Sequence, residues 1–200
     1  MDSGLARLRS CVPVMTRLGP SAMSEVARVD KAFETACRQV GRFLYHFSLL
    51  ERELDDGIGK LFGIEAGAVD IVTANMDFAR KVNVLRSAEV FKAEMPDEVR
   101  KRLLEETFSA IWSLNDKRKV VAHCPFSPGE QSGVVFRRAV ASKRLHVKDE
   151  EWTDLQFQTA FAEADKTRAN LGRIIAEMVP YTAAADFSDP RNSSYIAVVV

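Results

Sequence analysis

The chain has 200 residues, of which 46% are hydrophobic and 28% charged; this balance predicts one globular domain with a buried core and excludes a chain that is disordered throughout. Its 28 basic residues equal its 28 acidic residues, so no global field draws it to nucleic acid or a membrane surface, and any nucleic-acid contact must come from a local basic cluster. No apolar run approaches the roughly 20 residues of a membrane span, so we expect no membrane partner. The three cysteines fit neither a disulfide framework nor a zinc pattern, so we expect a cytoplasmic protein with free thiols.

Residues 1–28 are expected to form a poorly ordered N-terminal arm, whose apolar stretch is too short and too broken for a signal peptide. From about Val29 to Phe62, apolar residues recur at alternating spacings of three and four, which predicts one continuous stripe along a long helix. This length favours coiled-coil-like packing against a long partner helix. Gly57 is a weak point of the helix, and Gly63 is expected to end it. The stripe consists of Phe33, Ala36, Val40, Phe43, Phe47, Leu50, Leu54 and Leu61.

The middle of the chain carries boundary signals for further helices. A short helix or turn is expected at residues 65–75, and Asp77 is placed to cap the helix that follows. Pro96 and the two acids after it suit the start of another long helix. That helix is expected to run to about Ala122, because Pro125 forbids its continuation.

A small β-hairpin is expected before the last helix. Gly133–Val140 and Arg144–Val147 are rich in strand-forming residues. We expect this hairpin to be an accessory to the helices, because a two-stranded element adds little core. Thr153 is placed to cap the last helix, with the acids of residues 149–151 at its start, and Pro180 is expected to end it.

These elements predict an all-α fold, an up-and-down four-helix bundle with a small β-hairpin insertion before the last helix. The helical domain is expected to cover residues 29–179. The tail, residues 180–200, is polar except for its apolar end, residues 196–200. That end either adds a strand to a neighbour or is disordered, and we favour disorder.

One short motif carries chemistry. Residues 114–126 read LNDKRKVVAHCPF, so four residues separate Arg118 from His123. This resembles the signature of HEPN domains, an arginine followed after four to six residues by a histidine at the end of the penultimate core helix. Asn115 and the Ala-His pair also match, and with the order of the expected helices the resemblance covers about residues 29–179.

Two positions depart from the family pattern. Lys119 stands where HEPN domains often have asparagine. Pro125 stands where some members carry a tyrosine that partner nucleotidyltransferases modify, so we do not expect that regulation here. Cys124 lies next to His123, but adjacent side chains rarely face one another, so a cysteine nucleophile is not expected.

The resemblance implies metal-independent cleavage of RNA. A histidine at a helix C-terminus, where the dipole favours its charged form, suits proton transfer, and the arginine fork suits phosphate. In this interpretation the catalytic residues are His123, which moves protons to and from the attacking 2′-hydroxyl, and Arg118, which stabilises charge on the phosphate. Asn115, Lys117 and Lys119 would orient these groups or bind phosphate. No metal and no cofactor are expected. In the family two such motifs face each other across a dimer.

Simpler interpretations of the same residues stay open. His123 can bond a carbonyl at its own helix end, and Arg118 can pair with Glu51 or Glu53 on the first long helix. Lys117 and Lys119 can form a solvated face. Tyr45 and His46 are more readily explained by packing than by an approach to the motif. An ideal helix places residues five positions apart at about 140°, so His123 would meet Arg118 on one face only if the helix unwinds before Pro125.

Two functions of different classes therefore follow. The first is a HEPN-type RNA endonuclease, in a toxin or defence setting, with a protein antitoxin as a possible partner. The second is a non-catalytic HEPN-like helical dimer that binds a protein or nucleotide partner. Both involve a homodimer, because the first long helix carries more apolar surface than its neighbours are expected to cover.

Overall fold

The computed structural model describes residues 20–92, 98–142 and 144–184. In these ranges the chain is mostly helical and has one small antiparallel sheet, in keeping with the predicted class. The element bounds are α1 Pro20–Phe62, α2 Ala66–Thr73, α3 Phe78–Lys92, α4 Glu98–His123, β1 Phe126–Pro128, a 3-10 turn Glu130–Ser132, β2 Val134–Ser142, β3 Arg144–Trp152 and α5 Asp154–Ala184.

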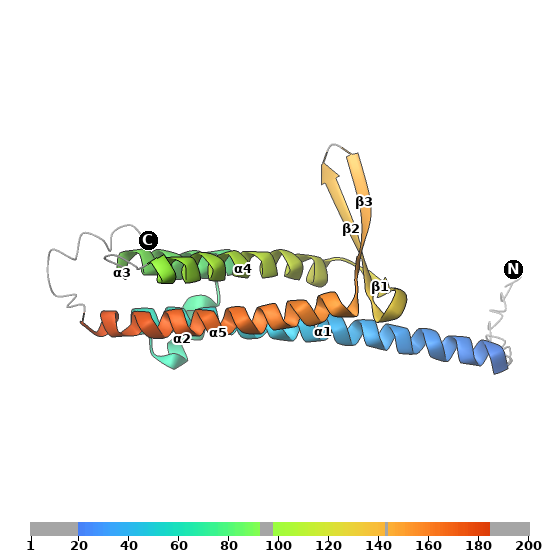
Figure 1. Ribbon diagram of the computed structural model, residues 1–200, viewed down its shortest axis with the longest axis horizontal. Coiled ribbons are helices and arrows are strands. Elements are labelled where there is room, and N and C mark those ends of the chain that lie inside the picture. Colours follow the sequence, from blue (N-terminus) through green and yellow to red (C-terminus); the bar gives the residue numbers. More distant parts are fainter. Residues whose placement is uncertain (1–19, 93–97, 143, 185–200) are drawn as a thin grey trace, which may run out of the picture.

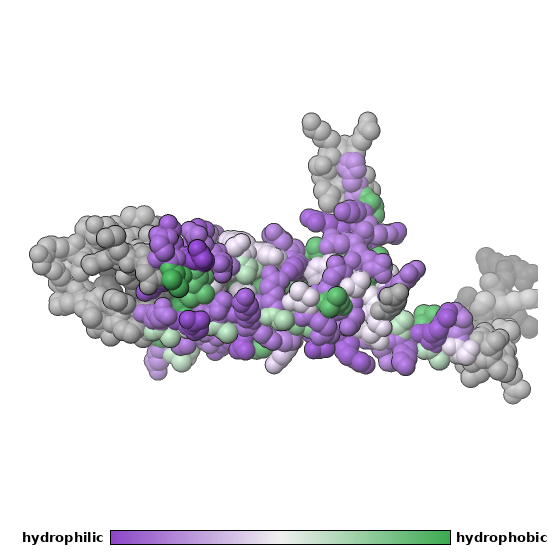
Figure 2. Space-filling view, in the orientation of Figure 1, coloured by the Kyte–Doolittle hydropathy of each residue, from purple (hydrophilic) through white to green (hydrophobic). Residues whose placement is uncertain are grey.

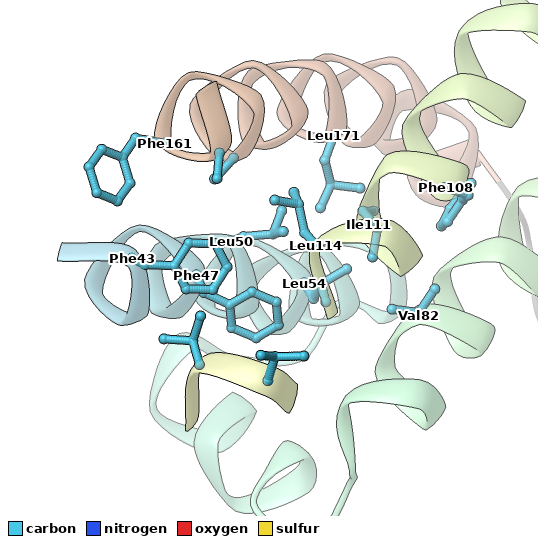
Figure 3. Close-up of a cluster of buried hydrophobic side chains, with 14 of the residues drawn as sticks. Phe43, Phe47, Leu50, Leu54, Val82, Phe108, Ile111, Leu114, Phe161 and Leu171 are labelled. Atoms are coloured by element: carbon cyan, nitrogen blue, oxygen red, sulfur yellow. The ribbon is translucent and has the colours of Figure 1, made fainter. Parts of the chain in front are cut away.

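The longer helices α1, α3, α4 and α5 lie along one common direction (Figure 1). The most extensive helix contact is between α1 and α5, and α4 packs on both. The core between them is apolar: Figure 3 shows Phe43, Phe47, Leu50 and Leu54 of α1 facing Ile111 and Leu114 of α4 and Leu171 of α5. The predicted α1 stripe is buried from Ala36 to Leu61, and only Phe33 is exposed.

Local signals set most helix ends where the sequence predicts them. The carboxylate of Asp77 accepts a hydrogen bond from the Arg80 backbone N–H at 2.8 Å. Gly63, which follows α1, has φ +61°, a conformation that glycine adopts without strain. The Thr153 hydroxyl accepts from the Gln156 N–H at 3.3 Å, and the Gln156 side chain accepts from the Thr153 N–H at 2.7 Å, which is a complete capping box.

Helices α1 and α5 extend beyond their expected ends. Helix α1 begins at Pro20, so residues 20–28, expected in a poorly ordered arm, are helical. Proline suits a first helical position, and the alanine, methionine and glutamate after it favour helix. Helix α5 continues past Pro180 to Ala184, because a proline removes one N–H from the ladder without forbidding the next turn. The remaining parts of the expected arm and tail, residues 1–19 and 185–200, lie outside the described residues.

The sheet is larger than the predicted hairpin. Strand β1 adds a third strand, in the order β1-β2-β3. Strand β3 includes residues 149–151, which we expected at a helix start. These acids are stable in a strand because they have partners: Asp149 pairs with Arg137 across the sheet at 3.4 Å, and Glu150 accepts from the Trp152 indole at 2.8 Å.

The sheet also belongs to the core, contrary to the expected accessory role. Val134, Phe136 and Trp152 at its base are buried, and Trp152 packs edge-on against Phe43 of α1, with ring centroids 5.9 Å apart. The rest of β2 and β3 projects away from the helices (Figure 1). The base of the sheet therefore closes one end of the helical core.

Candidate functional site

The Arg118 side chain points into the protein. It lies on the same face of α4 as Ile111 and Leu114, both fully buried, because positions three to four and seven residues apart share a helix face. Arg118 is half-buried, and its guanidinium lies 5.8 Å from the ring centroid of Phe47 on α1. The structure thus uses the arginine in a cation–π contact within its own chain.

The ion pair suggested between Arg118 and the first helix is not formed. Within the described residues Arg118 has no carboxylate partner, and Glu51 instead accepts from Lys81 of α3 at 3.2 Å. Lys81 also lies 2.9 Å from Asp55. The ammonium of Lys81 is buried between these two carboxylates, whereas the Arg118 guanidinium lies over an aromatic ring.

Lys81 was not singled out as a site residue by sequence reasoning. Burial, the largest single effect, lowers its pKa, but the hydrogen bonds and charges of Asp55 and Glu51 outweigh burial together, so the pKa of Lys81 is raised above its ordinary value. Since a charged and doubly paired lysine is a poor base, this cluster serves to join α3 to α1. No local sequence signal identifies it, because its acids lie 30 and 26 residues away.

The three residues expected to assist the motif take separate places. Asn115 is buried in the helical core. Lys117 forms an ion pair with Glu163 of α5, and Lys119 pairs with Asp116 at 2.8 Å on the exposed face of its own helix. They do not form a common phosphate cradle within one chain.

His123 is exposed and is the last residue of α4. The helix does not unwind before it, since the Cys124 N–H still donates to the Val120 carbonyl at 3.0 Å. Arg118 and His123 therefore keep the separation of about 140° that five helical positions impose. In the described residues the His123 ring has no hydrogen-bond partner, so it does not cap its own helix end.

His46 belongs to a different face of the molecule. Its Nδ1 lies 2.9 Å from a carboxylate oxygen of Asp165 on α5, and its ring stacks on Phe161 with centroids 5.1 Å apart. The guanidinium of Arg42 lies 4.6 Å from the centroid of the same phenyl ring. These contacts support the packing interpretation of His46, because they join α1 to α5 and not to the motif.

No three His, Cys, Asp or Glu side chains among the described residues gather closely enough to hold a metal ion. None of the described helices is both long and apolar enough to cross a bilayer. On the face shown in Figure 2 most of the described surface is hydrophilic.

Comparisons with protein families, with curated proteins and with solved structures found no match for this chain.

Proposed function

We propose that this chain is a HEPN-like helical protein that works by binding, as a homodimer with a protein or nucleotide partner, and that its Arg118 motif stabilises the helices. In this proposal α1, α3, α4 and α5 correspond to the up-and-down four-helix bundle of HEPN domains. The main support for this proposal is the position of the Arg118 side chain. It is half-buried against Phe47 and points about 140° away from His123 around α4.

The chemistry of RNA cleavage requires the two groups to meet at one phosphate. A general acid or base must come within hydrogen-bond reach of the proton it moves, and a stabilising cation must contact the oxygen on which charge develops. An arginine that packs inward and a histidine that faces solvent from the next helical turn do not converge in one protomer. Binding requires no such convergence.

The dimer is proposed at the N-terminal part of α1. The apolar spacing of the stripe continues upstream through Val29 and Val26, where it is only partly covered. Val26, Val29 and Phe33 are 49%, 55% and 49% exposed, although the Phe33 ring stacks on Phe126 of β1. Figure 1 shows this part of α1 extending beyond the other helices. A second copy of this chain would offer a stripe with the same spacing. Apolar residues at sustained spacings of three and four are typical of helices that pair.

An experiment separates binding from catalysis. RNA of mixed sequence is incubated with the wild-type protein in the presence of EDTA, and the mass of the protein is measured by light scattering at micromolar concentration. The proposal expects a dimer mass and intact RNA. RNA cleavage in EDTA would contradict the non-catalytic role, and a monomer mass would contradict the dimer.

A HEPN-type RNA endonuclease of toxin or defence type is the second candidate. Two observations favour it: the His123 ring is exposed, and Arg118 has no carboxylate partner among the described residues. In a dimer with facing motifs, a second His123 would supply the missing acid or base. The products would then end in a 2′,3′-cyclic phosphate, and the loss of His123 would abolish them.

A further inference from the structure

Beyond its base, the sheet continues as a two-stranded arm that stands away from the helices (Figure 1). Strand β1 pairs only with residues 134–136 of β2, so beyond Arg137 neither edge of the arm has a further strand within the described residues. The arm consists of six residue pairs, from Arg137 with Asp149 next to the base to Ser142 with Arg144 at the far end. At about 3.3 Å per residue it is roughly 20 Å long, so it can reach a partner that the helices do not touch.

The arm carries a local excess of positive charge. Residues 137–148 include five lysine or arginine residues and no aspartate or glutamate, in a chain whose net charge is zero. The carboxylate of Asp149, at the end of the arm nearest the helices, lies 3.4 Å from Arg137 and offsets one of these charges. The arm is therefore the kind of local basic cluster through which a neutral protein binds a polyanion.

One face of the arm brings like charges together. Arg138 and Lys148 lie directly opposite each other in the strand register. Both side chains are exposed, and among the described residues neither has a carboxylate partner. His146, two positions from Lys148, lies on the same face and is also exposed. Like charges at opposed positions destabilise a sheet, and a bound anion removes that repulsion. We refer to Arg138, His146 and Lys148 as the basic face.

The shape of the arm distinguishes between polyanions. Its two strands, about 4.8 Å apart, form a ribbon of the kind that the major groove of B-DNA admits, because that groove is about 12 Å wide and 8.5 Å deep. The major groove of an RNA duplex is too narrow for side chains to read. Arg138 and Lys148 form the second of the six pairs counted from the helices. A flat anionic membrane that met the tip would leave them unbound, whereas a groove contacts the arm along its length.

We propose that this arm inserts into the major groove of double-stranded DNA and that the basic face binds the phosphates along the groove. The inference goes beyond the proposed function, because it adds a class of partner and uses no residue of the Arg118 motif. Contacts to phosphates fix the position of a protein on DNA but do not read its bases. The arm therefore binds DNA without strong preference for sequence.

Fluorescence anisotropy of a labelled DNA duplex of mixed sequence, titrated with the full chain at low salt, tests the ligand class. The logarithm of the association constant should fall against the logarithm of the salt concentration with a slope of about −2 or steeper, because each neutralised phosphate contributes about −0.9. An RNA duplex of the same sequence should bind at least roughly 10-fold more weakly. No binding of DNA, equal binding of the RNA duplex, or tighter binding of single-stranded RNA or phosphatidylserine vesicles would overturn the proposal.

Variants test the basic face. Arg138→Gln combined with Lys148→Gln should raise the Kd for DNA roughly 10-fold or more and make the salt slope shallower by about 2. Lys60→Gln combined with Arg173→Gln removes the same charge from exposed positions on α1 and α5. This control should change the Kd less than roughly 3-fold, because salt screens charges far from the contact. Equal losses in the two double variants would mean that only net charge matters, which would overturn the site.

A third variant tests insertion. Replacing residues 139–147 with a short Gly/Ser turn keeps Arg138 and Lys148 but removes the reach of the arm, so it should also raise the Kd roughly 10-fold or more. Binding at wild-type strength would overturn insertion into the groove. Circular dichroism checks each fold, and the variant without Arg138 and Lys148 should melt no lower than wild type, because a repulsion is removed. A wild-type dimer that leaves DNA unbound would contradict this inference alone.

Discussion

The guanidinium of Arg118 lies 5.8 Å from the ring centroid of Phe47, which joins the end of α4 to the centre of α1. The residue that most strongly indicates phosphate chemistry in the sequence is thus in contact with the core. A cation over an aromatic ring contributes about 0.5–2 kcal/mol, depending on its desolvation. Arg118 therefore has a measurable structural role, whatever the protein binds.

Replacing Arg118 with alanine should lower the free energy of unfolding by about 1–2 kcal/mol, because both the cation–π contact and the packing of the side-chain stem are lost. Urea denaturation measures this loss. His123→Ala is the matched control, and its effect should stay within about 0.5 kcal/mol because the side chain is exposed. If instead both variants keep wild-type stability and both lose an RNA-cleaving activity, the endonuclease interpretation is correct.

Replacing Lys81 with methionine should destabilise the protein by about 1–3 kcal/mol, because Glu51 and Asp55 lose the cation that compensates them. Lys119→Met removes an exposed pair and should cost less than about 1 kcal/mol. Thermal unfolding of the three proteins at pH 7 compares them. Equal losses of stability in the two variants would show that the buried cluster stabilises the protein no more than the exposed pair does.

The contribution of the Lys81 cluster to stability should fall at high pH. The pKa of Lys81 is raised in the folded protein, so its stabilising contribution is complete below the unfolded pKa, near 10.5, and is lost as the pH rises through the higher folded value. Above about pH 10.5, wild-type protein should thus lose stability more steeply with rising pH than Lys81→Met. Parallel pH profiles would contradict this role.

Gly57, which we expected to be a weak point of α1, is a close-packing position. A Cβ atom there would meet the Ile175 Cδ1 atom at 2.5 Å, so Gly57→Ala should destabilise by about 1–3 kcal/mol. Gly41→Ala, with open space around its Cβ, should stabilise by about 0.5–1 kcal/mol through helix propensity. Adding Ile175→Val to Gly57→Ala should restore part of the loss in a chemical denaturation series, since it removes the clashing methyl group. A gain in stability from Gly57→Ala alone would disprove the close contact.

The sheet should divide into an essential base and a dispensable tip. Phe136→Ala should cost about 3–5 kcal/mol, because Phe136 is fully buried against Trp152 and Phe157. Replacing residues 139–147 with a short Gly/Ser turn should cost much less, since the described side chains there, such as His146 and Val147, are exposed. Calorimetric melting temperatures compare the two changes, and similar losses would mean that the tip contributes to the fold.

Apart from the start of α1 and the end of α5, the helices could be predicted from the sequence, because their signals are local. The spacing of apolar residues identifies α1, and Asp77, Thr153 and Gly63 mark boundaries that involve only neighbouring residues. The acids of β3 were assigned to a helix start because charge at a helix N-terminus is also a local signal. Their strand partners, such as Arg137, become apparent only when the sheet is formed.

The residues of the candidate site could be named from the sequence, but their contacts could not, because the partners lie far away along the chain. Nothing near Lys117 in the chain indicates Glu163, 46 residues away, and nothing near Lys81 indicates Glu51. The spacing of Arg118 and His123 along a helix was enough to predict their angular separation. Whether the helix would unwind depended on the packing of Val120 and Val121, which are buried in the last turns of α4. Contacts between distant segments form because burial of the shared core outweighs the entropy of ordering them, and that balance is a property of the whole fold.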